Sequence, residues 1–155
     1  MAIQNKTLLK MGGIIILGGL FVFSIIWSLN PTQEKTDVVQ KKDEKITIKT
    51  EKGEVQTNNF YQSIVEKSGN NYALEETKDF DIVYYDKDQT FFITIYSQPA
   101  AKARDLAENT LLKRLGIDIG QACQLKVVVR VPFSVDPQLS GQDYSLSFCP
   151  NGKSF

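Results

Sequence analysis

The chain has 155 residues, with 18 basic and 18 acidic side chains and no histidine, so its formal net charge at pH 7 is zero. Such a chain has no overall field to attract nucleic acid, and we expect no nucleic-acid role. The lack of histidine excludes Ser-His-Asp and Cys-His catalysis. With only two cysteines, it also argues against a zinc site. We therefore expect a protein that is not an enzyme and holds no metal or other cofactor.

Residues 11–29 form a long apolar run without a charge. A helix needs about 20 such residues to cross the hydrocarbon core of a bilayer. In lipid, a helix also satisfies its own backbone hydrogen bonds, which outweighs the cost of the glycines in this run. We therefore predict a single transmembrane helix over residues 11–29, which makes the lipid bilayer the first expected partner.

The tail before this run, residues 1–10, contains two lysines and no acidic residue. The positive-inside rule then favours a cytoplasmic tail, with the C-terminal part outside the cytoplasm. Lys35, Lys41 and Lys42, on the far side of the run, argue for the opposite orientation. A cleaved signal peptide is the alternative, but no small-x-small cleavage pattern follows the run. We expect a single-pass protein of the cell membrane.

Residues 30–57 are rich in Gln, Glu, Lys, Asp and Thr and poor in large apolar side chains. Such a segment cannot bury enough surface to offset the entropy lost on ordering. We predict a flexible charged tether, which leaves residues 58–155 as one folded domain. Within the tether, residues 45–50 alternate with strand period, so an edge strand is the alternative for this stretch.

The domain is expected to begin with a short helix over residues 60–67. Asn58 or Asn59 is placed to cap this helix, and Gly69 is placed to end it. Residues 80–96 then show strand periodicity on both sides of a polar turn. This pattern predicts a β-hairpin.

A longer helix is predicted over Ala100–Leu115, because Pro99 suits a helix start and Gly116 suits a helix end. One face of this helix is expected to pack on a sheet. The members of that face are Ala100, Ala103, Leu106, Ala107, Leu111 and Leu115. Arg104 and Arg114 are expected at the edges of the face, with their charged ends in water.

Two further strands are predicted at residues 125–131 and 144–149, joined by a long connection over residues 132–143. The predicted fold is an α+β domain of two layers, with about four strands in the order β-β-α-β-β and a mainly antiparallel sheet packed on one long helix. Cys123 precedes the third strand and Cys149 ends the fourth. Antiparallel pairing would bring the two sulfurs together, so we predict a disulfide, with two free thiols as the alternative. A disulfide needs an oxidising compartment, which supports a domain outside the cytoplasm.

Two regions are candidate surfaces for a partner. One is the sheet face opposite the long helix, where the alternation places Val83, Tyr85, Phe92, Tyr96, Val128 and Arg130. This face is too apolar for open water, and we expect the short helix to cover it with Phe60, Ile64 and Val65. The other region is the long connection, which is expected to fold back on the core unless it binds a partner. The candidate partner surface therefore comprises Phe133, Val135, Leu139, Tyr85, Phe92, Tyr96 and Arg130.

The expected function is a non-enzymatic, membrane-anchored interaction or scaffold module outside the cytoplasm, with a protein partner in a cell-envelope assembly. The envelope context rests on an analogy of layout with accessory subunits of pilus, secretion and division machines, and on no motif. The alternative is a domain that binds a small molecule or a peptide through the aromatic sheet face. A concave aromatic pocket would favour that alternative, whereas a flat apolar patch would favour the scaffold.

Overall fold

The computed structural model describes residues 44–155 of the chain. The predicted cytoplasmic tail, the predicted transmembrane helix and the first half of the predicted tether lie outside the described residues. Within residues 44–155, no helix is both long enough and apolar enough to span a bilayer.

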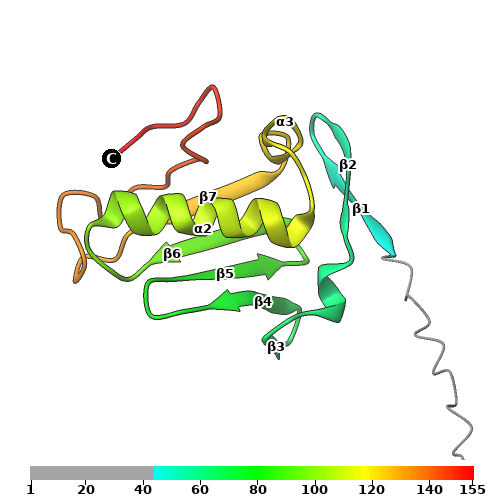
Figure 1. Ribbon diagram of the computed structural model, residues 1–155, viewed down its shortest axis with the longest axis horizontal. Coiled ribbons are helices and arrows are strands. Elements are labelled where there is room, and N and C mark those ends of the chain that lie inside the picture. Colours follow the sequence, from blue (N-terminus) through cyan, green and yellow to red (C-terminus); the bar gives the residue numbers. More distant parts are fainter. Residues whose placement is uncertain (1–43) are drawn as a thin grey trace, which may run out of the picture. The chain divides into compact units, whose positions relative to one another are not determined.

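The main sheet contains five strands in the order β3-β4-β5-β6-β7 (Figure 1). These strands are Glu66–Ser68, Asn71–Glu76, Phe80–Tyr85, Thr90–Ile95 and Lys126–Arg130. The strands from β3 to β6 pair antiparallel, whereas β7 runs parallel to β6. A parallel neighbour needs a long crossover, which is supplied here by the helix α2, Ala100–Leu115. The domain is thus α+β with a largely antiparallel sheet, as predicted, but β7 departs from the antiparallel pattern.

Helix α2 lies across one face of the sheet (Figure 1). It ends at Gly116, as predicted; this residue has φ 61°, and its N–H donates to the carbonyl of Leu112. Five of the six residues predicted for its packed face are buried: Ala100, Ala103, Ala107, Leu111 and Leu115. Leu106 is 53% exposed, because about 100° per residue carries it far round the helix from Leu111. The same rotation places Arg104 inside the packed face instead of at its edge, and its side chain is buried.

A β-hairpin occupies the part of the predicted tether that the structure describes. Its strands are β1, Lys45–Thr50, and β2, Gly53–Asn58, and they form a separate two-stranded sheet. Ile48 and Val55 lie directly opposite each other, and both join the hydrophobic core. These two side chains offset the ordering cost of an otherwise polar segment. The tether prediction is therefore wrong for residues 45–57, and the strand predicted at 45–50 belongs to this hairpin.

The short helix predicted over residues 60–67 is reduced to one 3₁₀ turn, η2, at Phe60–Gln62. The N–H of Val65 donates to the carbonyl of Ala73, which draws the following residues into the sheet as β3. Gly69 does not end a helix. It has φ 59° in the tight turn between β3 and β4.

The strand predicted at residues 144–149 is replaced by a single bridge between Val129 and Tyr144. Beyond Tyr144 the backbone bonds to helix α2 instead of β7. The guanidinium of Arg104 donates to the carbonyl of Ser145, and the carboxylate of Glu108 accepts from the N–H of Ser147. These side chains satisfy the backbone groups that a fourth strand would have used.

The Cys123–Cys149 disulfide is confirmed, with its Cα atoms 5.5 Å apart. Cys123 follows the short helix α3, Ile119–Ala122, whose first turn is held by a capping box between Asp118 and Gln121. Cys149 lies in a turn and not at the end of a strand. The predicted disulfide is therefore right, although the strand pairing from which it was predicted is absent.

Candidate functional site: the outer face of the sheet

Phe92 lies near the middle of the sheet face that points away from α2. Its direct neighbours across the sheet are Val83 on β5 and Val128 on β7. The ring of Tyr85 meets the ring of Phe92 edge to face, with 4.9 Å between the centroids. The guanidinium carbon of Arg130 stands 4.9 Å from the centre of the Phe92 ring. We refer to these five residues as the outer-face cluster.

The strand alternation explains why these side chains share one face. Successive side chains of a strand point to opposite sides, so the neighbours of the cluster point toward α2. Those inward side chains are buried: Ile82, Tyr84, Phe91, Ile93, Val127 and Val129. The two sheet faces predicted from the strand alternation are therefore confirmed.

The short helical segment that was predicted to cover this face lies elsewhere. Phe60 is buried among the inward side chains, with its ring centroid 5.0 Å from that of Tyr84 and 5.7 Å from that of Phe91. Val65 is 54% exposed. Tyr85, on the outer face, is 36% exposed, and Phe92 is half-buried. The expectation that the short helix covers the outer face is wrong, because its aromatic anchor packs into the core.

Arg130 is held in place by Asp143, the last residue of the long connection. Its Nε lies 2.6 Å from Oδ1 and its second nitrogen 3.0 Å from Oδ2 of that carboxylate. The hydrogen bond from Arg130 holds the pKa of the Asp143 carboxyl below its usual value, and the same bond raises the pKa of Arg130. Both side chains are more than half exposed, so the pair adds little stability. It fixes the guanidinium above Phe92, where a cation is favoured by the ring.

Tyr96 follows directly after β6 and adds a further aromatic ring to the surface. It is 45% exposed, and its hydroxyl donates to the Asp81 carboxylate at 2.7 Å. Partial burial, followed by that hydrogen bond, raises the pKa of Tyr96. The phenol therefore remains a neutral donor at neutral pH.

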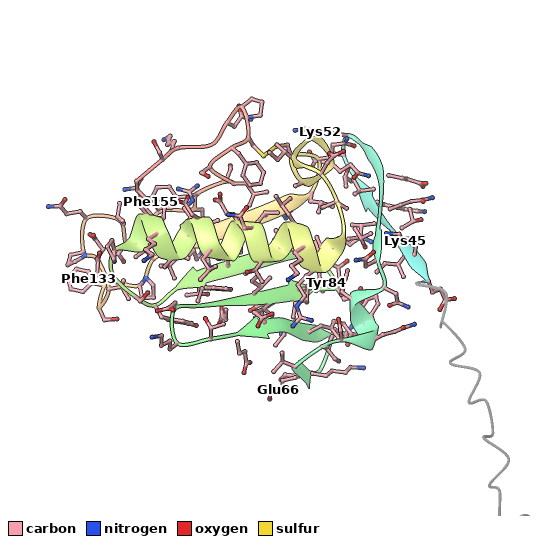
Figure 2. The ribbon with its side chains drawn as sticks, viewed as in Figure 1. Lys45, Lys52, Glu66, Tyr84, Phe133 and Phe155 are labelled. Atoms are coloured by element: carbon pink, nitrogen blue, oxygen red, sulfur yellow. A yellow bond between two sulfur atoms is a disulfide. The ribbon has the colours of Figure 1, made fainter. Side chains whose placement is uncertain are left out.

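The three predicted residues of the long connection have different surroundings. Val135 and Leu139 are half-buried and pack against the core. Gln98 donates to the carbonyl of Val135, and the Asp136 carboxylate accepts from the N–H of Leu139, so the connection folds back. Phe133 is 71% exposed and lies in the connection itself (Figure 2). The structure thus brings Tyr85, Phe92 and Arg130 together, and it leaves Val135 and Leu139 in a packing role.

Two grooves lie elsewhere on the domain, and neither is lined by the outer-face cluster. The first, of about 840 Å³, runs beside the C-terminal half of α2 and is lined by Asn59, Phe80 and Arg114 among others. The guanidinium of Arg114 donates two hydrogen bonds to Oε2 of Glu75, one from Nε at 2.9 Å and one from Nη2 at 2.7 Å. The side-chain oxygen of Asn59 is buried and has no hydrogen-bond partner within the described residues.

The second groove, of about 800 Å³, lies between the turn of the β1–β2 hairpin and the disulfide. Sequence reasoning missed both grooves, because each is lined by segments that are far apart in the chain. In residues 44–155, no group of three or more Cys, Asp or Glu side chains is arranged to hold a metal ion.

Comparison of the chain with models of known protein families gives no match, and neither curated proteins nor solved structures match it.

Proposed function

We propose that this protein is a non-enzymatic, membrane-anchored interaction or scaffold module of a cell-envelope assembly, and that its outer-face cluster binds a protein partner. The apolar run over residues 11–29 supports the anchor. The Cys123–Cys149 disulfide supports a domain outside the cytoplasm, because such bonds persist in oxidising compartments. The open aromatic face of the sheet is the observation that carries the binding role.

The composition of the cluster favours a protein as the occupant of this face. Tyrosine and arginine are over-represented among the residues that dominate binding energy at protein interfaces. Tyr85 and Phe92 supply apolar area, and Arg130 supplies a charge that is already oriented by Asp143 and by the Phe92 ring. Preorganisation lowers the entropy cost of binding. The expected partner surface is apolar at its centre and carries a carboxylate that faces Arg130.

The geometry also favours a broad partner over a small molecule at this face. Small ligands bind in concave pockets that enclose most of their surface. The cluster residues line neither of the two grooves described above and stand on an open strand surface. A sheet face of this kind offers contact area without enclosure, which suits a protein.

A domain that binds a small molecule or a peptide is the second candidate, and Asn59 favours it. A buried oxygen without a partner is costly, and a ligand with an N–H or O–H group in the first groove would satisfy it. In this second candidate, Asn59, Phe80 and Arg114 would contact the ligand, and the outer-face cluster would not.

Site-specific photo-crosslinking in native membranes tests the proposal. A photoreactive residue replaces Tyr85 or Tyr96 on the outer side, or Leu106 on α2 as a control that is somewhat more exposed than either. We expect one crosslinked protein to be shared by the first two positions and absent from the third. The same crosslinks should disappear when Arg130→Glu is added. Equal crosslinking from Leu106, or none from Tyr85 and Tyr96, would rule out this face as the interface.

A further inference from the structure

The second groove gathers four lysines from three separate parts of the chain. Lys49 and Lys52 come from the β1–β2 hairpin, Lys87 from the turn between β5 and β6, and Lys126 from the start of β7. Figure 2 shows Lys52 near the hairpin tip, where its ammonium group donates to the carbonyl of Cys123 at 3.2 Å. The disulfide and the segment after it form the facing wall. Nothing in the sequence indicates that these lysines meet.

The charge of this groove is unbalanced, although the whole chain is neutral. Its four lysines face only two acidic residues, Glu51 and Asp88, which leaves an excess of two positive charges. Within residues 44–155, the ion pairs are Arg104–Glu108, Arg114–Glu75 and Arg130–Asp143, so none of the four ammonium groups is paired. Like charges gathered in one concave site raise the local concentration of counter-ions. An anion bound there would relieve their repulsion.

The remaining lining of the groove suits an anion with several oxygen atoms. Three amide side chains offer N–H donors: Gln89, Gln124 and Asn151. The buried side chains of Leu125 and Leu146 contribute apolar surface. An apolar floor lowers the local dielectric constant and strengthens the attraction between an ammonium group and an anion.

The use of lysine instead of arginine in this groove favours phosphate as the bound anion. Arginine forks suit planar carboxylates, whereas lysine acts as a compact point charge and is a common phosphate binder. The lining contains four lysines and no arginine. Its volume of about 800 Å³ exceeds what one phosphate needs and falls in the range of sites for larger ligands. We infer that this groove binds a ligand with more than one phosphate group, either free in solution or in the headgroups of an anionic lipid.

Lysine footprinting on the full-length chain in non-ionic detergent tests this inference and separates the two sources. The probes are tripolyphosphate in one arm and, in the other, cardiolipin added to the micelles, because its headgroup carries two phosphates. Acetylation of each lysine is read by mass spectrometry, with the exposed Lys78 and Lys102 as internal controls outside both grooves. We expect protection of the four groove lysines while both controls stay reactive. Protection by tripolyphosphate indicates a soluble ligand, and protection by cardiolipin alone indicates a lipid headgroup.

A matched pair of charge-removing variants gives a second, quantitative test. Lys87→Gln/Lys126→Gln removes two groove charges, and Lys78→Gln/Lys102→Gln removes two exposed charges elsewhere. All four side chains are exposed and make no hydrogen bond to other described residues, so both variants should fold. The groove variant should bind the protective probe about tenfold or more weakly, and the control should bind it as the original chain does.

Uniform protection of all lysines, no protection by either probe, or equal weakening in the two variants would overturn the inference. None of these outcomes bears on the outer-face cluster, because the crosslinking experiment uses different residues and a different readout.

Discussion

Arg104 and Glu108 form an ion pair that is buried between helix α2 and the C-terminal segment, with 2.7 Å between Nε and Oε1. Each partner also binds that segment. Arg104 donates to the carbonyls of Ser145 and Lys153, and Glu108 accepts from the N–H and the hydroxyl of Ser147. The ring of Phe155 stacks on the guanidinium, 4.3 Å from its central carbon. The pair therefore fastens the end of the described chain to the helix.

Removing one member of this pair should destabilise the domain strongly. Arg104→Ala or Glu108→Ala leaves one buried charge without its partner, and we expect a loss of about 3–5 kcal/mol in the free energy of unfolding, measured in urea. Arg114→Ala is the control, because its ion pair with Glu75 is partly exposed and should cost about 1 kcal/mol or less. Equal losses for Arg104→Ala and Arg114→Ala would show that burial does not set the strength of the first pair.

The alanines of α2 should tolerate no enlargement where they meet the sheet. Ala107 is fully buried, so Ala107→Leu should lower the free energy of unfolding by about 1–3 kcal/mol through overpacking. Ala101, on the exposed side of the same helix, provides the matched substitution Ala101→Leu, which should change stability little. Thermal melting of both variants checks the prediction, and similar melting temperatures would contradict the close packing.

The disulfide should contribute a large share of the domain's stability. Its cysteines are separated by 26 positions, and closing such a loop stabilises a fold by about 3.5 kcal/mol in the chain-entropy picture. The double variant Cys123→Ser/Cys149→Ser should lose about this much in urea unfolding. Thiol labelling of the denatured chain, prepared from its native source without reductant, should find no free thiol. Two reactive thiols in that preparation would remove the support for an oxidising compartment.

The Arg130–Asp143 pair should respond to acid in a defined direction. Asp143 has a lowered pKa in the folded chain, so its contribution is present above its unfolded pKa and is lost as the pH falls through the folded value. The carboxyl carbon of Asp143, followed by NMR, should therefore titrate below the usual value of about 3.9. Arg130→Gln should move this midpoint upward, and an unchanged midpoint would show that Arg130 is not its cause.

The sequence predicted best the elements whose signals are local. The predicted range of helix α2, Ala100–Leu115, matches the structure at both ends. Pro99 and Gly116 mark these ends, and no long-range contact is needed to recognise them. The face assignment of Phe92 and Arg130 was also right, because strand alternation is a local property. These positions include the centre of the candidate site.

The elements that were missed depend on distant contacts. The β1–β2 hairpin has a polar sequence, and its burial rests on the opposed pair Ile48 and Val55 meeting the core. The predicted last strand failed because Arg104 and Glu108, some forty residues earlier, bind its backbone. The second groove could not be predicted for the same reason, since no periodicity in the sequence relates Lys49, Lys87 and Lys126.

The contacts of Arg104 and Glu108 with the C-terminal segment also have a consequence during biosynthesis. Arg104 finds its backbone acceptors 41 and 49 positions further along the chain, at Ser145 and Lys153. Until that stretch has been made, the segment that covers Arg104 and Glu108 is missing, and the two side chains lack the backbone partners that it supplies. A nascent or prematurely terminated chain that stops before Ser145 would lack these contacts and the disulfide, so it should be less stable and more open to the proteases that remove unfinished proteins.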